Sequence, residues 1–257
     1  MIDVTRTVPM RWTARRDGDD ADSLRALVRP DGVCFLYTTV EADDVHHALI
    51  TAAVDDLPGD LYTEVDDQAA ERLADLAGLG FSLHRAEHRY VLPVDPARTG
   101  LGDAALPAGF TVVSAADADV QRLAALDDTL RADVPGAAGW HNDPAEFARQ
   151  TFDDPQFDRD TYLVAVDASG GYAGLVRVWR RPVRSRLGLI AVVRDHRRSG
   201  LARALLGRAF AVLHAQGEDG ATCEVDVTNV ASNALMIALG GQRDGGNVEL
   251  VLRRHSA

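Results

Sequence analysis

One stretch in the second half of the chain, 187–206, constrains the fold most, because its character changes twice along its length. It begins with the apolar run 187–193, which predicts a buried strand. Residues 194–199 are too charged and too few to be anything but a turn. From Gly200 onward, apolar residues recur at the spacing of a helix. They are Leu201, Leu205, Ala209, Val212 and Leu213.

A strand that enters a helix through a turn ending in glycine forms a ready site for an anion. The N–H groups of the first helical turn lack partners within the helix, and the helix dipole favours negative charge there. Gly200 and Ala202 carry no bulky side chain, so an anion can come close to the backbone. The stretch therefore predicts a site for a phosphate-bearing ligand.

The distribution of charge agrees with such a site. The net charge of −12 argues against a nucleic-acid surface, but residues 1–103 alone carry 10 Arg against 20 Asp and Glu. The second half is nearly neutral and gathers arginines around the strand and turn. These are Arg177, Arg180, Arg181, Arg184, Arg186, Arg194, Arg197 and Arg198. This local positive field suits a small anionic cofactor, although the arginines at 180–186 can equally solvate a hairpin.

Composition and length set the broad class of the protein. The chain has 257 residues, of which 46% are hydrophobic and 26% charged, as in soluble domains. No apolar run approaches the roughly 20 residues that span a bilayer, and the N-terminus lacks the pattern of a signal peptide. We therefore expect a cytoplasmic protein that binds neither membrane nor nucleic acid. Cys34 and Cys223 do not form a disulfide framework, and the adjacent His46 and His47 do not predict a metal site.

The chain divides by composition into two lobes. Residues 1–20 are polar and predict irregular structure, and 22–28 suggest a short helix. Three prolines and three glycines between 93 and 109 predict a linker. We therefore expect a first lobe at 1–96, a linker at 97–108 and a second lobe at 109–257.

The two lobes share a repeat. A shift of 160 residues places Glu64-Val-Asp on Glu224-Val-Asp and Leu79-Gly on Leu239-Gly, without a gap across a strand–helix–strand segment. Shared spacing of this kind predicts two structurally related halves. The first half differs where the chemistry is expected, because Ala69 stands in the place of Asn229 and no glycine lies within 38–44. Only the second half is expected to bind the anion.

The second half resembles the GCN5-related N-acetyltransferase (GNAT) superfamily. The superfamily's signature, Gln/Arg-x-x-Gly-x-Gly/Ala, is matched by Arg197-Arg-Ser-Gly-Leu-Ala202 in the predicted turn, and a second similar block follows at 224–240. The resemblance implies a mixed α/β (α+β) fold: a mostly antiparallel sheet with a splayed strand pair, flanked by helices. It also implies a truncated, degenerate first copy without a cofactor site, as in tandem mycothiol synthase-like proteins.

The resemblance implies acetyl-coenzyme A as the cofactor. The backbone around the turn would hold its pyrophosphate, and the N–H of Val192 or Val193 would face the thioester carbonyl. The remaining residues expected to bind this cofactor are Arg194, Arg197, Arg198, Ser199, Gly200, Leu201, Ala202 and Arg203. Asn229 and Asn233 would meet the pantetheine or adenosine end, or would simply cap the following helix.

The carboxylates of the next predicted strand are the candidate catalytic groups. Glu224 precedes Asn229 by five residues, the spacing of the base in related acetyltransferases, and Asp226 shares its face. Both can instead belong to a solvated or salt-bridged strand face. Met236 stands where many members of the superfamily have the tyrosine that protonates the leaving thiolate, so this acid is missing.

The expected acceptor is a small primary amine, such as an aminosugar, an antibiotic or a metabolite. No cysteine lies in the turn, which favours direct transfer in a ternary complex. The candidate acceptor-binding residues, each of which can instead serve packing or capping, are Asp127, Asp128, Trp140, His141 and Trp179. Two alternatives are a peptide or protein N-acetyltransferase and a non-catalytic acyl-coenzyme A sensor. The sequence leaves a monomer and a homodimer open.

Overall fold

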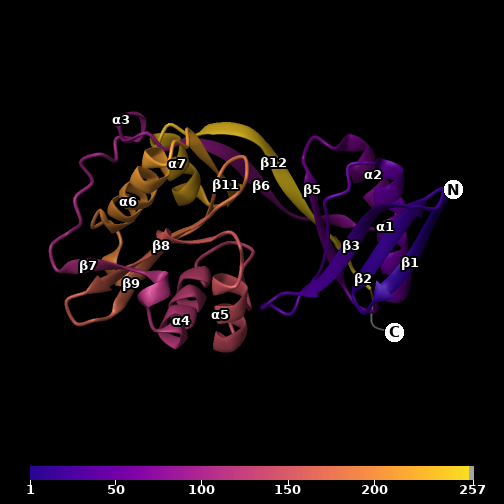
Figure 1. Ribbon diagram of the computed structural model, residues 1–257, viewed down its shortest axis with the longest axis horizontal. Coiled ribbons are helices and arrows are strands. Elements are labelled where there is room, and N and C mark those ends of the chain that lie inside the picture. The colour runs from indigo at the N-terminus through magenta and orange to yellow at the C-terminus, as the bar shows by residue number, and fades with distance from the viewer. Residues whose placement is uncertain (255–257) are drawn as a thin grey trace. The chain divides into compact units, whose positions relative to one another are not determined.

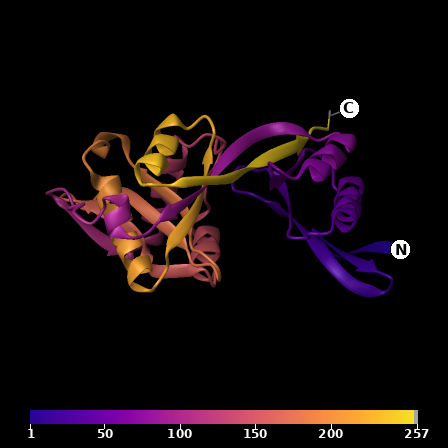
Figure 2. The ribbon, with the colours of Figure 1, turned by 90° about the horizontal axis from the view of Figure 1, so that it is seen from above.

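The computed structural model describes residues 1–254, which form two compact units (Figure 1). The first unit comprises Met1–Glu87 and the residues from Gly245 onward, and the second comprises His88–Asp244. Two long strands, β6 (Ser82–Pro93) and β12 (Gln242–Leu252), run through the dividing line (Figure 2). Each strand therefore supplies residues to both units, an arrangement that composition does not predict.

The first unit is an antiparallel meander completed by one crossover and by the end of the chain. Its elements are β1 (Ile2–Val8), β2 (Arg11–Arg16), β3 (Asp19–Val28), β4 (Cys34–Thr38), α1 (Asp43–Asp56), β5 (Leu61–Asp66) and α2 (Ala70–Gly78). Strands β4 and β5 are parallel, and β12 pairs antiparallel with β5 from Asn247↔Asp66 to Leu252↔Leu61.

The irregular segment and helix expected at 1–28 are corrected to three strands. The period-two alternation of buried residues explains this, because Trp12 and Ala14 on β2 and Leu24 and Ala26 on β3 all face the core. Charged neighbours on the solvent face mask the alternation in the sequence.

The second unit has helices on both faces of its strands (Figure 1). Its elements are α3 (Pro96–Thr99), β7 (Phe110–Ser114), the 3-10 turn η1 (Ala115–Asp117), α4 (Val120–Arg131), α5 (Pro144–Phe152), β8 (Phe157–Asp167), β9 (Tyr172–Trp179), β10 (Arg186–Val192), the 3-10 turn η2 (Arg194–His196), α6 (Leu201–Ala215), β11 (Gly220–Asp226) and α7 (Val230–Ala238). Strands β7 to β10 are antiparallel, with α6 and α7 packed on one face and α4 and α5 on the other. This is the mostly antiparallel sheet flanked by helices that the resemblance implied.

The segment expected as a linker, 97–108, lies within the second unit. Leu101 is 3% exposed and packs in the core with α6, and the Arg203 guanidinium donates to the Gly100 carbonyl at 2.7 Å. The prolines and glycines therefore shape a packed connection rather than a flexible one, and the units divide at Glu87/His88 instead.

The repeat of 160 residues is confirmed element by element. Helix α2 maps onto α7 without any offset, and β5 and β6 map onto β11 and β12. The segment before this repeat differs between the units: residues 39–42 join β4 to α1, whereas 193–200 join β10 to α6. The longer connection in the second unit contains the turn in which the sequence predicts an anion site.

Candidate functional site

The site begins where two neighbouring parallel strands separate. Strands β10 and β11 pair only at Arg186↔Thr222, so the rest of β10 faces an opening on that side. On its other side, β10 stays paired with β9 up to Val192↔Gly174. A splayed pair of this kind leaves backbone groups of β10 free to pair with an extended ligand.

The register with β9 decides which N–H groups face the opening. The Val193 N–H donates to the Ala173 carbonyl at 2.9 Å, so it is already used. Because N–H groups alternate in direction along a strand, those of Ile190 and Val192 point to the opening. Of the two residues expected from the sequence, Val192 fits and Val193 does not. Ile190 was missed, because the register cannot be read from one strand alone.

The turn after β10 is where the sequence predicts an anion site. Gly200 has φ +90° and caps α6, and Arg198 also adopts a left-handed conformation with φ +61°. Within residues 1–254, the N–H groups of Ala202 and Arg203 have no acceptor. They border a pocket of about 410 Å³. Its lining residues are Val192, His196, Arg197, Arg198, Gly200, Leu201, Ala202 and Arg203.

Two of the expected phosphate-binding arginines are directed to a carboxylate instead. Arg194 and Arg197 both bind Asp133, with Arg194 Nε at 3.1 Å and Arg197 Nη2 at 2.5 Å from Asp133 Oδ2. Their hydrogen bonds hold the pKa of Asp133 well below its usual range. Arg197 Nε also donates to the Val192 carbonyl at 2.9 Å. These residues therefore brace the turn, and Val193 and Arg194 line a second pocket, of about 450 Å³, beside Asp133.

Ser199 and His196 have roles that the sequence does not reveal. The Ser199 hydroxyl donates to the His196 carbonyl at 2.6 Å and so closes the turn. The His196 ring packs edge-on against Phe110, with ring centroids 5.1 Å apart, and lines the 410 Å³ pocket. Only its position inside the predicted turn could have identified it.

The two asparagines of α7 serve the structure. Asn229 caps the helix by accepting from the Ser232 N–H at 3.1 Å. The Asn233 amide donates to the carbonyls of Asp226 and Asn229 and accepts from the Tyr90 hydroxyl at 2.8 Å. Both side chains therefore bind backbone groups at the start of α7, as in the alternative to cofactor binding that the sequence left open.

The candidate base and its neighbour are held differently. Glu224 Oε2 accepts from Arg186 Nε at 2.7 Å, and within residues 1–254 its Oε1 has no partner. Asp226 accepts from the Thr228 N–H at 2.8 Å and from its hydroxyl at 2.5 Å. Glu224 therefore keeps one oxygen available, whereas Asp226 shapes the turn before α7.

Met236 and Cys223 lie in the core. Both are 2% exposed, and their sulfur atoms are 3.4 Å apart. Burial raises the pKa of the Cys223 thiol to about 12. Position 236 thus offers no proton to the opening, and the Cys223 thiol stays protonated and inert.

The expected acceptor residues from α4 and the next loop meet in one network. His141 Nδ1 lies 2.8 Å from Asp128 Oδ2, and the Asn142 amide donates to both Asp127 and Asp128. The Arg131 guanidinium lies over the Trp140 indole, 4.1 Å from the ring centroid. Trp179 lies on β9, with its ring centroid 5.4 Å from the guanidinium of Arg177, which binds Asp127. Its indole covers Gly188 so closely that no side chain fits there.

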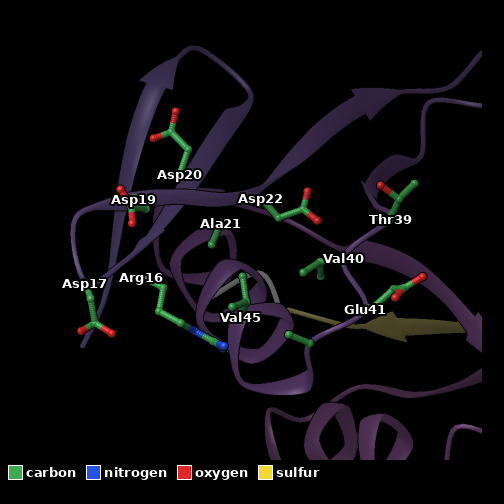
Figure 3. Close-up of a pocket in the computed structure, with 11 residues that line it drawn as sticks. Arg16, Asp17, Asp19, Asp20, Ala21, Asp22, Thr39, Val40, Glu41 and Val45 are labelled. Carbon is green, nitrogen blue, oxygen red and sulfur yellow. The ribbon is translucent and has the colours of Figure 1, made fainter.

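A pocket in the first unit has the opposite electrostatic character. It encloses about 750 Å³ between β2, β3 and the short connection from β4 to α1 (Figure 3). Its carboxylates are Asp17, Asp19, Asp20, Asp22 and Glu41. These negative charges would repel a phosphate.

None of the helices within residues 1–254 is both long and apolar enough to cross a membrane.

The sequence profile of the Acetyltransferase (GNAT) family matches residues 124–240. The mycothiol acetyltransferase of Clavibacter sepedonicus is 28% identical over 235 residues, which cover 86% of this chain and 73% of that protein. The mycothiol acetyltransferase of Clavibacter michiganensis subsp. michiganensis (strain NCPPB 382) is 30% identical over 202 residues, which cover 76% of this chain and 62% of that protein.

Two solved structures share the fold along nearly the whole chain. A GCN5-related N-acetyltransferase from Sphaerobacter thermophilus superposes with a TM-score of 0.71 at 16% identity, covering 98% of this chain and 84% of its own. A tandem GNAT protein from the clavulanic acid biosynthesis pathway also gives a TM-score of 0.71, at 19% identity. The match covers 96% of this chain and 83% of that protein.

Proposed function

Since the chain belongs to the GNAT superfamily and is an N-acyltransferase, we propose that its second unit transfers the acetyl group of acetyl-coenzyme A directly to the primary amine of a small molecule. One observation carries this proposal: the opening between β10 and β11 leads to a basic pocket bordered by unpartnered N–H groups. Acetyl-coenzyme A supplies a thioester, an extended amide-containing arm and a pyrophosphate.

The residues of the turn fit the anionic end of this cofactor. The N–H groups of Ala202 and Arg203 donate to phosphate oxygens, and the Arg198 side chain adds positive charge at the pocket. On β10, the N–H groups of Ile190 and Val192 donate to the extended arm and to the carbonyl oxygen of the thioester. Negative charge that develops on this oxygen is thereby stabilised by a fixed dipole.

Glu224 is the proposed proton acceptor. An ammonium group cannot attack a thioester, so the amine must first lose a proton. The free Oε1 of Glu224 takes this proton, directly or through a water molecule, while Arg186 holds Oε2 in place. Asp226 is unsuited to this role because its carboxylate is engaged by Thr228.

The acceptor is proposed to be a small molecule rather than a protein. The relatives named as mycothiol acetyltransferases support this choice. Direct transfer is supported by the inert, buried Cys223, which leaves the second unit's core without a usable covalent carrier.

The test is release of coenzyme A by the purified full chain with a panel of small primary amines and one peptide with a free N-terminus. At least one small amine should accelerate release above the amine-free rate, and its mass should rise by one acetyl group. Acceleration by the peptide alone would contradict the proposed acceptor class. Tight cofactor binding with a release rate that no amine changes would instead favour an acyl-coenzyme A sensor.

A further inference from the structure

A buried ionic cluster lies on the α4 and α5 face of the second unit, and the proposed reaction does not yet use it. Asp127 is 1% exposed and stands at its centre. It accepts from Arg131 Nε at 2.6 Å, from the Asn142 amide at 3.0 Å and from Arg177 Nη1 at 3.3 Å. Arg177 itself is only 6% exposed, so water solvates it poorly.

The guanidinium groups of the cluster have more hydrogen-bond donors than Asp127 can satisfy. Arg131 and Arg177 both bind the carboxylate of Asp127, whereas the neighbouring carboxylate of Asp128 is engaged by Asn142 and His141. Burial together with the neighbouring charge of Arg177 lowers the pKa of Arg131. Leaving a buried guanidinium donor without an acceptor is costly, so the donors that Asp127 does not satisfy favour a further acceptor.

Two buried polar atoms in the same place have no partner. Within residues 1–254, neither the Tyr162 hydroxyl nor Arg177 Nε makes a hydrogen bond. Tyr162 is fully buried, and the Arg177 guanidinium lies 5.7 Å from its ring centroid and 5.4 Å from that of Trp179. Buried polar groups in folded proteins are normally satisfied, so two neighbouring orphans point to a missing acceptor atom.

The cluster is on the same face of the sheet as the proposed base. Arg177 pairs with Leu189 of β10 and with Tyr162 of β8, next to the stretch that borders the opening. Its strand neighbours Val176 and Val178 point into the core on the α6 face, as Cys223 and Val225 do on β11. Arg177 and Glu224 therefore both project to the α4 and α5 face.

Resting on the proposed function, we propose that the acceptor carries a carboxylate beside its amine, and that Arg177 and Tyr162 bind this carboxylate. The two oxygens of a carboxylate match a guanidinium edge and a hydroxyl, the two groups that lack a partner here. The acceptor class is thereby narrowed to amino acids and similar amino-carboxylates. The amine is then held on the face from which Glu224 projects.

The loop between α4 and α5 controls entry to this subsite. Asn142 covers Asp127, and Trp140 covers Arg131. Gly136 and Gly139 have left-handed conformations, at φ +79° and +81°, in the same loop. Because Arg177 and Tyr162 are buried, a carboxylate reaches them only when this loop moves.

The sharpest variant is Tyr162→Phe, since it removes a hydroxyl that has no partner in the protein. The full chain is assayed with L-amino acids, each beside its own carboxamide, which keeps the amine and removes the negative charge. The wild type should favour the carboxylate, and Tyr162→Phe should lower kcat/KM for the carboxylate roughly tenfold and for the carboxamide by less, because a hydrogen bond to a charged oxygen is the stronger one. Tyr172→Phe is the matched control, because the Tyr172 hydroxyl accepts from the Asp119 N–H at the other end of β9.

Equal use of acid and amide by the wild type, or an equal loss of both in Tyr162→Phe, would overturn the inference. If no amine is acetylated although acetyl-coenzyme A binds, the proposed function fails, and binding still tests the subsite. In that case, thermal stabilisation by amino acids over their carboxamides, measured with coenzyme A present and lost in Tyr162→Phe, upholds the carboxylate site. Absence of that difference refutes it.

Discussion

Arg186 Nε lies 2.7 Å from Glu224 Oε2, at the point where β10 and β11 part. This ion pair joins the last paired residues of the two strands to the proposed base, and it leaves Glu224 Oε1 without a partner within residues 1–254. The same contact therefore positions the carboxylate and marks where the opening begins.

Replacement of the proposed base should reduce chemistry without reducing cofactor binding. Glu224→Gln keeps the shape of the side chain but cannot take a proton, so we expect kcat to fall by about 10²- to 10⁴-fold. The dissociation constant for acetyl-coenzyme A should stay within about twofold. Glu218→Gln is the control, since Glu218 binds the Ser185 hydroxyl away from the opening. A Glu224→Gln enzyme with wild-type kcat would remove this residue from the mechanism.

Substitution of the two glycines with left-handed conformations at the ends of α6 should distinguish an effect on the stability of the chain from an effect on cofactor binding. Gly200 and Gly217 have φ +90° and +86°, and neither has a neighbour within 4 Å of the position of a Cβ. Alanine at either site should lower the free energy of unfolding by about 1 kcal/mol, because of the backbone conformation alone. Only Gly200→Ala should also weaken binding of coenzyme A, as measured by calorimetry. Equal affinities in the two variants would show that the turn at Gly200 does not hold the cofactor.

His46 should make the stability of the first unit depend on pH. The side chain is 2% exposed on α1, and burial lowers its pKa to about 4. Below its unfolded pKa of about 6.5, the unfolded chain takes up a proton that the folded chain refuses, so stability is lost as pH falls from about 6.5 towards 4. Urea unfolding should show a loss of about 2 kcal/mol between pH 7 and pH 5 from this group.

A pair of adjacent substitutions isolates this effect. His46→Gln should flatten the dependence on pH, whereas His47→Gln should retain it, because His47 is half exposed. An unchanged pH dependence in His46→Gln would assign the loss to other groups.

Glu249 on β12 should contribute strongly to the stability of the first unit. Glu249 on β12 has a side chain only 3% exposed, with Arg29 Nη1 at 3.3 Å and Arg85 Nε at 3.2 Å. Glu249→Ala leaves two partly buried guanidinium groups short of a partner, and it should cost about 3 kcal/mol in urea unfolding. Glu41→Gln is an exposed control in the same unit and should cost less than about 0.5 kcal/mol. Comparable losses of stability in both variants would show that the buried ion pairs of Glu249 do not stabilise the first unit.

Local features of the chain could be predicted from the sequence. The turn at 194–200 and the repeat of 160 residues depend on short-range spacing, and each appears in the structure where the spacing placed it. The positive φ of Gly200 follows from the same local pattern.

Features that depend on pairing between distant strands could not be predicted. The choice of Val192 over Val193 follows from the register with β9, and the return of β12 to the first unit follows from its pairing with β5. The ion pair of Glu224 with Arg186 and the cluster around Asp127 likewise join residues that are far apart in the sequence. Hydrophobic periodicity carries no information about such partners.

The most direct test of the account is a calorimetric titration of acetyl-coenzyme A into the full chain and into Gly200→Glu, with unfolding midpoints measured for both. We expect one site per chain, because within residues 1–254 the basic turn belongs to the second unit alone and the pocket of the first unit is acidic. We also expect Gly200→Glu to remove this site while the chain stays folded. Two sites per chain, or binding that persists in a folded Gly200→Glu variant, would contradict it.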